Sequence, residues 1–248
     1  MDLAYHKAVM VEEVVTAFTP LQPGTVLDGT LGAGGHALAL LEAFPANTLL
    51  GVDRDAEALR AAGETLAEYA GRIRLLQCTF DRAVEVAGVV DGTLAGALLD
   101  LGVSGHQLDA DERGFTFRRG ADLDMRMDPQ AGGPTAAVFL NESPREELAR
   151  VFRDYGDIPR AGRLASVVVR RREREPFRSS DDLVGALSAA LDRSPKSSEK
   201  ARLFQAVRIE INGEIDLLQR ALPVLREALG PEGTLVVIAY HSVEDRVV

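Results

Sequence analysis

The chain has 248 residues, of which 46% are hydrophobic and 27% charged, and its formal net charge is -10. These proportions are typical of a globular protein with a substantial core, and the acidic balance excludes a general nucleic-acid coat, whose affinity depends on basic surface. The single cysteine, Cys78, excludes an internal disulfide and a zinc site built from several thiolates.

Short apolar runs alternate with helical stretches over the first hundred residues. We expect strands at 24–30, 48–55, 73–80 and 95–103, and helices at 36–44 and 56–70. Strands that alternate with helices predict an α/β fold with a parallel, doubly wound, Rossmann-like sheet.

A long interval separates the fourth expected strand from the fifth, which we place at 233–241. A βαβ unit needs only about 30 residues, so the excess predicts an insertion. We expect a mostly helical subdomain at 109–198, set into a domain formed by 1–108 and 199–248. The helices of this subdomain are expected at 143–156, 160–175 and 179–192.

The segment 201–222 has apolar residues three or four positions apart, which predicts an amphipathic helix. We expect these residues to form one stripe that faces the sheet: Phe204, Val207, Ile211, Ile215, Leu218 and Leu222.

A glycine-rich loop follows the first strand, and Gly32 and Gly34 begin a match to the dinucleotide pattern, which is weak alone. Asp28, Asp53 and Asp100 end three of the expected strands, whose carboxyl ends converge on one crevice. These carboxylates would repel a pyrophosphate. S-adenosylmethionine has no phosphate and carries a sulfonium and an ammonium. The sequence therefore favours this cofactor, with Asp53 accepting hydrogen bonds from both ribose hydroxyls.

Each of these residues also has a structural interpretation. The loop glycines could simply permit a tight turn. Asp53 could cap the helix that begins at residue 56, although Asp55 is better placed to do so. Phe80, after the third strand, is either a platform for adenine or a core residue.

Six motifs occur in an order that suggests a known family: "DGTLGAGGH", "GVDRD", "LLDLGVSGHQLDADERGFTF", "DLDMRMD", "FQAVRIEINGEI" and "VVIAYHSVEDRVV". Together they closely resemble the ribosomal RNA small subunit methyltransferase H family, from His6 to Val248. The resemblance implies S-adenosylmethionine as cofactor, N4 of a cytosine in the decoding region of 16S ribosomal RNA as methyl acceptor, and the small ribosomal subunit as partner. It places cofactor contacts on Gly34, Gly35, His36, Asp53, Phe80, Asp100 and Gln107.

Members of that family continue past the last motif into further antiparallel strands. We therefore expect the fifth strand of this chain to keep an unpaired edge, and exposed edges invite association. The 248-residue chain should be less stable than a longer form, or a partner should cover the edge, a homodimer being one possibility.

The acceptor amine of cytosine is a poor nucleophile because its lone pair is delocalised into the ring. Transfer needs in-line approach to the methyl group and acceptors for the amine hydrogens. Asp100, Ser104 or the carbonyls of residues 101 and 102 could supply such acceptors, although Asp100 could equally serve the cofactor alone. His241, near the end of the fifth strand, could accept the released proton or be a structural histidine.

Arginines are concentrated in the expected insertion. Residues 109–128 contain six acids and four arginines, and residues 170–178 contain five arginines and two glutamates. We expect Arg113, Arg126 and Arg171 to contact RNA. The alternatives are salt bridges within the loop and a solvated helix face.

Three other functions compete with this reading. They are a methyltransferase for DNA or for a protein amine, a non-catalytic module that binds RNA or cofactor, and an NAD-dependent oxidoreductase. No metal site is expected. Because the sequence has no apolar run of roughly 18 residues and no signal-peptide pattern, we expect no membrane association and a cytoplasmic protein.

Overall fold

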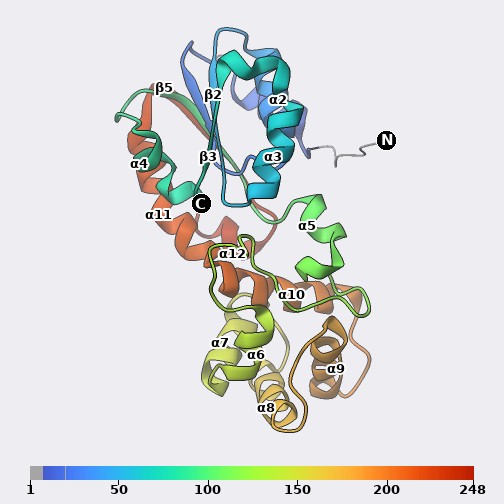
Figure 1. Cartoon of the computed structure of the whole chain (residues 1–248). Coiled ribbons are helices and arrows are strands. Elements are labelled where there is room, and N and C mark those ends of the chain that lie inside the picture. The colour runs from blue at the N-terminus through green and yellow to red at the C-terminus, as the bar shows by residue number, and fades with distance from the viewer. Residues whose placement is uncertain (1–7, 20) are drawn as a thin grey trace. The chain divides into compact units, whose positions relative to one another are not determined.

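The computed structural model describes residues 8–19 and 21–248 and divides into two compact units (Figure 1). The first unit comprises the described residues up to Ser104 together with Ile215–Val248, and the second unit is Gly105–Glu214. The second unit therefore begins slightly before the expected insertion and ends later, because it includes a helix that we had assigned to the sheet.

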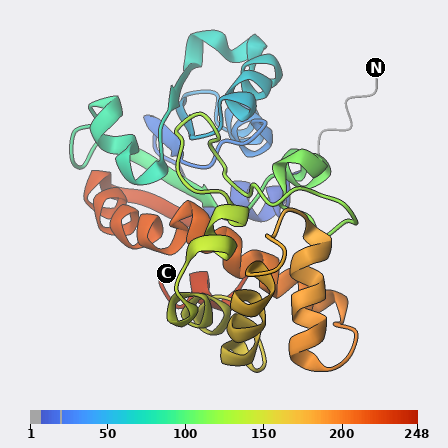
Figure 2. The same cartoon turned by 60° about the horizontal axis from the view of Figure 1, so that its bottom comes forward.

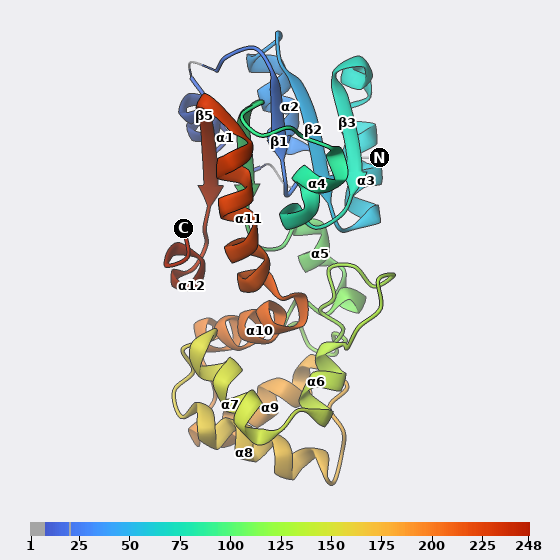
Figure 3. The same ribbon diagram turned by 90° about the vertical axis from the view of Figure 1, so that its left-hand side faces the viewer.

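The first unit contains a five-stranded parallel sheet. Its strands are β1 (Thr25–Asp28), β2 (Thr48–Asp53), β3 (Ile73–Gln77), β4 (Leu94–Asp100) and β5 (Leu229–Ile238). The strand order is β3-β2-β1-β4-β5, and Figure 3 shows β5 at one edge. This order reverses direction between β1 and β4, which is the topological switch point where open α/β sheets bind ligands. The predicted doubly wound fold is confirmed.

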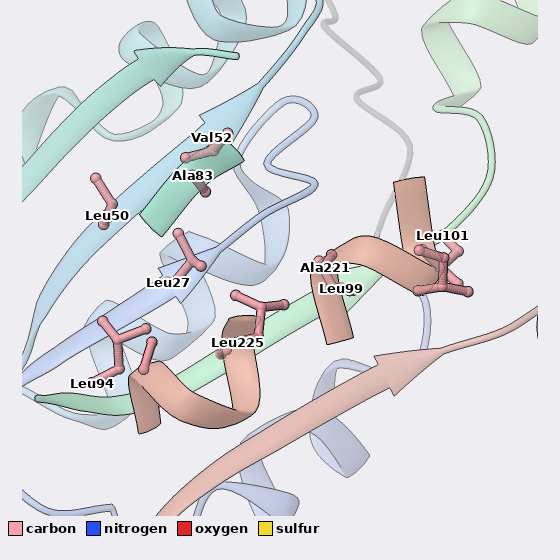
Figure 4. Packing of buried hydrophobic residues seen from close by; sticks show 12 residues of the cluster. Leu27, Leu50, Val52, Ala83, Leu94, Leu99, Leu101, Ala221 and Leu225 are labelled. Atoms are coloured by element: carbon pink, nitrogen blue, oxygen red, sulfur yellow. The ribbon is translucent and has the colours of Figure 1, made fainter. Parts of the chain in front are cut away.

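Helices cover both faces of this sheet. Apolar residues of β1, β2 and β4 pack on one face with α4 (Ala83–Ala87) and α11 (Glu214–Ala228), and Figure 4 shows Leu27 and Leu99 in this cluster. On the other face they pack with α1 (Val11–Ala17), α2 (Gly35–Ala43) and α3 (Ala56–Thr65). Burial on both faces explains why the central strands are continuously apolar.

The segment 201–222 is not one helix on the sheet, so that prediction was wrong. α10 (Ser197–Asn212) ends at Gly213, which has the left-handed φ of 60° typical of a helix C-terminus. Phe204 and Val207 are buried in α10, which contacts helices of the second unit, whereas Leu218 of α11 packs on the sheet. The apolar spacing continues across Gly213, and periodicity alone does not identify which layer each turn contacts.

Two other elements differ at their ends. The helix expected at 56–70 is α3 followed by the 3-10 helix η1 (Ala67–Arg72). β5 begins and ends earlier than expected, and its pairing with β4 shifts register between Leu94 and Gly96. After β5 the chain forms the short helix α12 (Ser242–Asp245). After β3 it forms the 3-10 helix η2 (Phe80–Arg82).

The second unit is helical (Figure 2, green to orange). The three helices expected in the insertion are present as α7 (Arg145–Asp154), α8 (Ala161–Arg172) and α9 (Ser180–Leu191). The remaining elements are α5 (Gly105–Asp109), η3 (Asp111–Arg113), α6 (Ala136–Glu142) and α10. Ser179 and Asp182 form a capping box that starts α9. Within the described part of the chain, no helix is long and apolar enough to cross a bilayer.

Candidate active site

Three neighbouring strands end in a carboxylate. Asp28, Asp53 and Asp100 are the last residues of β1, β2 and β4, and the strand order places β1 between the other two. The three acids were expected to lie together at the carboxyl ends of the strands, and the strand order places them there. The charges of Asp53 and Asp100 both act on the carboxyl group of Asp28.

The glycine loop between β1 and α2 is tied to β2. Gly32 and Gly34 have left-handed φ values of 54° and 87°, so the turn itself requires them. The backbone N–H of Gly32 donates to Oδ2 of Asp53 at 2.8 Å. A Cβ on Gly34 would lie 3.3 Å from the Leu66 side chain, and Gly35 is the first residue of α2. The turn explains Gly32 and Gly34 without a ligand, and cofactor contacts there remain a prediction.

Asp53 and Asp55 have separate roles. Oδ1 of Asp55 accepts a hydrogen bond from the N–H of Glu57 at 3.0 Å and caps α3, as expected. Oδ1 of Asp53 accepts from the backbone N–H of Asp55 at 2.9 Å. Because a carboxylate oxygen has two lone pairs, each oxygen of Asp53 can accept one further hydrogen bond, which suits a pair of ribose hydroxyls. Burial raises the pKa of Asp53.

Phe80 begins η2 and is half-buried. It packs against the core cluster on the α11 face, and its Cβ would lie 3.0 Å from a Cβ placed on Gly29. The buried part of the side chain belongs to the core, and an adenine contact through the exposed part stays a prediction.

Asp28 and His36 are buried polar side chains with unsatisfied atoms. Asp28 is 1% exposed, and its Oδ2 has no hydrogen-bond partner among the described residues, nor does either ring nitrogen of His36. Nε2 of His36 lies 3.5 Å from Oδ2 of Asp100, which is too far for a strong hydrogen bond. Buried polar atoms without partners indicate a missing ligand or water. The residues present therefore fit a small polar ligand that offers both hydrogen-bond donors and acceptors.

The ionisation of Asp28 should make stability depend on pH. Burial raises its pKa from 3.8 to about 7, so between these values the folded protein binds more protons than the unfolded chain. Stability should fall as pH rises through this range and then level off. Asp28→Asn should remove the Asp28 contribution to this fall, while the raised pKa of Asp53 keeps its own, and should be more stable above pH 7 by up to about 4 kcal/mol. Urea unfolding of both ligand-free proteins checks this, and parallel pH curves would contradict it.

Two residues after β5 are tied to this part of the structure: Glu244, which the sequence predicted to face the crevice, and Tyr240, which the sequence did not single out. The hydroxyl of Tyr240 donates to Oδ1 of Asp100 at 2.8 Å, and the backbone N–H of Tyr240 donates to Oε2 of Glu244 at 2.9 Å. Glu244 is only 2% exposed. The only sequence signal for this arrangement is the closeness of polar residues to a strand end.

His241 caps α12, and its imidazole faces Glu244. Nδ1 accepts a hydrogen bond from the backbone N–H of Glu244 at 3.3 Å, and Nε2 lies 3.1 Å from Oε1 of the same residue. Nδ1 therefore serves as a helix cap, whereas Nε2 is buried and makes no hydrogen bond with a described residue, so both alternatives for His241 stay open. Ser104, the other candidate besides Asp100, is half-buried in the loop after β4, and its chemical role stays a prediction.

The candidate substrate residues and Gln107 lie in the second unit. Gln107 is in α5 and is 7% exposed. Arg126 makes two hydrogen bonds to Asp124, from Nε at 2.8 Å and from an amino group at 2.6 Å. Arg171 hydrogen-bonds Asp182 at 2.6 Å, so its guanidinium is already engaged inside this unit. Arg126 and Arg171 are therefore both paired with a carboxylate of this unit, and an RNA contact stays a prediction for each.

The loop 124–128 that carries Arg126 is held by side chains from elsewhere in the second unit. Oδ1 of Asn212 accepts from the N–H of Met127 at 2.8 Å, and Nδ2 donates to the carbonyl of Met125 at 2.7 Å. Arg113 donates to the carbonyl of Met127 at 3.1 Å, so it supports the loop. Met125 is buried with a positive φ of 61°, a conformation that costs free energy. The sequence did not identify Asn212.

Comparisons with known proteins identify the family. The model of the MraW methylase family matches residues 3–248. The ribosomal RNA small subunit methyltransferase H of Gemmatimonas aurantiaca is 48% identical over 98% of this chain and 76% of its own length. That of Heliobacterium modesticaldum is 42% identical, over 98% and 80%. Among solved structures, an rRNA methylase from Streptococcus thermophilus matches 37% of this chain and 54% of its own at 17% identity and a TM-score of 0.32. The family model spans both units of the fold, and the chain belongs to the MraW methylase family.

Proposed function

We propose that this S-adenosylmethionine-dependent methyltransferase methylates N4 of a cytosine in the decoding region of 16S ribosomal RNA. The observation that carries the proposal is the row of carboxylates at the ends of β2, β1 and β4, beside buried polar atoms without partners, in a chain of the MraW methylase family. Such a row suits a cationic cofactor and an acceptor that carries amine hydrogens.

On the cofactor side, Asp53 would accept the ribose hydroxyls with the lone pairs that Gly32 and Asp55 leave open. Asp28 and His36 would gain partners for their buried atoms. The glycine loop and Phe80 would complete the contacts made by the first unit, and Gln107 is a contact that the family resemblance implies. Bound S-adenosylmethionine supplies an electrophilic methyl group, and the protein must position the acceptor amine in line with it.

On the acceptor side, Asp100 would accept a hydrogen bond from the cytosine amine. This bond would draw the lone pair of the amine nitrogen out of conjugation with the ring. The hydroxyl of Tyr240 occupies one lone pair of Oδ1, and the carboxylate side chain is 23% exposed, so acceptor capacity remains. Ser104, four residues later, is the second candidate acceptor.

Arg126 would contact the RNA. Arg126→Ala should lower methyl transfer to small subunits by about 5- to 150-fold while leaving cofactor affinity unchanged, because Arg126 is proposed to bind RNA and not the cofactor. Arg153→Ala is the matched control, since Arg153 makes a similar two-bond contact with the adjacent Asp154. Steady-state kinetics and calorimetry measure the two effects. Equal kinetics in the two variants would remove Arg126 from the RNA contact.

Mass spectrometry of nucleosides from treated small subunits tests the proposed reaction. We expect N4-methylcytidine at one site, and more product on assembled or partly assembled subunits than on a short naked oligonucleotide, because the acidic body offers little general attraction. Methyl on C5 or on ribose, with none on N4, would overturn the assignment. Product only on DNA or on a protein amine would favour another substrate, and binding without turnover would indicate a non-catalytic module.

Two further proposals concern the setting of the protein. A cytoplasmic location follows from a ribosomal substrate. A homodimer through β5 is supported by the pairing of this strand with β4 alone among the strands of the described chain. Sedimentation velocity at several protein concentrations tests the dimer.

A further inference from the structure

Tyr240 combines an exposed ring with a fixed hydroxyl. Its relative exposure is 55%, large for a tyrosine whose hydroxyl makes a hydrogen bond. A tyrosine that serves only the core buries its ring, and one that serves only solubility leaves its hydroxyl in water. Here the tip of the side chain is attached to Asp100 at the end of β4, and much of the ring remains open.

The backbone of Tyr240 is also held in place. Oε2 of the buried Glu244 accepts its N–H at 2.9 Å, and His241 contacts the other carboxylate oxygen at 3.1 Å. A buried carboxylate is costly unless its oxygens have such partners. Glu244 thus fixes the turn between β5 and α12, and the hydroxyl of Tyr240 fixes the ring at its far end. The orientation of an exposed ring would otherwise fluctuate among rotamers.

We propose that the ring of Tyr240 is the platform on which the base to be methylated stacks, which makes it a substrate-binding residue of the site. This inference rests on the proposed function and adds to it the group that holds the base beside Asp100.

The chemistry next to the ring favours a base over other parts of a nucleic acid. The carboxylate of Asp100 accepts a hydrogen bond from the Tyr240 hydroxyl, and Asp28 and Asp53 end the neighbouring strands. The negative charge of these carboxylates would repel a phosphate. A cytosine is neutral, has a flat π face and carries amine hydrogens that a carboxylate accepts. Proteins bind unpaired RNA bases by stacking on aromatic rings combined with hydrogen bonds to the base edge. Enzymes that modify a base must first remove it from its stack.

Phenylalanine and leucine at position 240 separate the ring from the hydroxyl. Tyr240→Phe keeps the ring and loses the bond to Asp100, whereas Tyr240→Leu keeps an apolar side chain and loses the aromatic face. Tyr240→Phe keeps the stacking face but loses the bond that orients it, so its kcat/KM for small subunits should fall clearly less than that of Tyr240→Leu. Tyr240→Leu and Tyr240→Ala should fall by roughly 5- to 150-fold, the usual value of one stacked base. S-adenosylmethionine affinity should be the same in all of them.

Val90→Ala is the control for removing an exposed apolar side chain. Val90 is 67% exposed and lies before β4, at the opposite end of that strand from Asp100. Its loss should change neither kcat/KM for small subunits nor the affinity for S-adenosylmethionine.

A second readout, the binding of a fluorescent base, is independent of catalysis. In a single-stranded RNA with the fluorescent base pyrrolocytosine at the target position and S-adenosylhomocysteine present, wild type and Tyr240→Phe should quench the fluorescence, and Tyr240→Leu should not.

The outcomes separate this inference from the proposed function. If the wild type forms N4-methylcytidine and Tyr240→Leu matches it in kcat/KM, the platform is overturned and the reaction stands. If Tyr240→Phe loses as much as Tyr240→Leu, the hydroxyl matters and the stacking role is overturned. If no N4-methylcytidine forms but wild type and Tyr240→Phe quench the fluorescence and Tyr240→Leu does not, the platform stands and the proposed reaction is wrong. Absence of quenching by the wild type at protein concentrations that saturate RNA binding overturns the platform.

Discussion

Asp53→Ala is expected to weaken S-adenosylmethionine binding by about 1.5–3 kcal/mol, a factor of roughly 10 to 150, through the loss of charged hydrogen bonds to ribose. The same change removes the acceptor for the N–H of Gly32, so the glycine loop loses its attachment to β2. Both effects act on the cofactor. Isothermal titration calorimetry with wild type and variant measures the difference directly.

Asp55→Ala provides the matched control for Asp53. Asp55 lies two residues away and is buried, but its side chain caps α3. Its removal should lower the free energy of unfolding by about 0.5–2 kcal/mol and leave cofactor affinity nearly unchanged. Equal cofactor affinity in the wild type and Asp53→Ala would remove Asp53 from the binding site.

Asp100→Ala should impair cofactor binding and methyl transfer together. The carboxylate ends β4, lies 3.5 Å from Nε2 of His36 and accepts the hydroxyl of Tyr240. As an acceptor for the amine hydrogens it would contribute about 10²- to 10⁴-fold to the rate. Single-turnover rates at saturating S-adenosylmethionine should therefore fall by a factor in that range, beyond any loss of affinity seen by calorimetry.

Asp100→Asn and Tyr240→Phe help to interpret that result. Asparagine keeps a carbonyl oxygen but loses the charge, so part of the rate should return. Tyr240→Phe removes the bond to Asp100 and leaves the carboxylate intact, so a fall confined to Asp100 variants assigns the effect to the carboxylate. An unchanged single-turnover rate in Asp100→Ala would limit Asp100 to cofactor binding.

The sequence was sufficient to predict the sheet and the positions of its acids. The three central strands are buried on both faces and read as apolar runs, and each run ends at an acid, so Asp28, Asp53 and Asp100 could be placed without a structure. The cap at Asp55 also followed from local rules, since capping depends on the next few residues.

The missed residues act over long distances or on irregular backbone. Tyr240 bonds a residue 140 positions earlier, and Asn212 bonds the carbonyl of Met125, 87 positions away. No local pattern encodes such pairings. Arg113 and Arg171 were identified as cations, but their charge alone could not reveal that one supports a loop and the other pairs with Asp182.

The placement of the second unit between β4 and α11 affects how the chain folds during translation. β4 pairs with β5, yet almost 130 residues separate them along the chain. At about 5–20 residues per second, the ribosome needs roughly 6–26 s to synthesise that interval. Throughout it the partner edge of β4 is unfilled, although β1, β2 and β3 are already available. The helices made meanwhile have mostly local contacts, which form fast. β5 thus joins the sheet only after the second unit has been synthesised, in an order that translation sets.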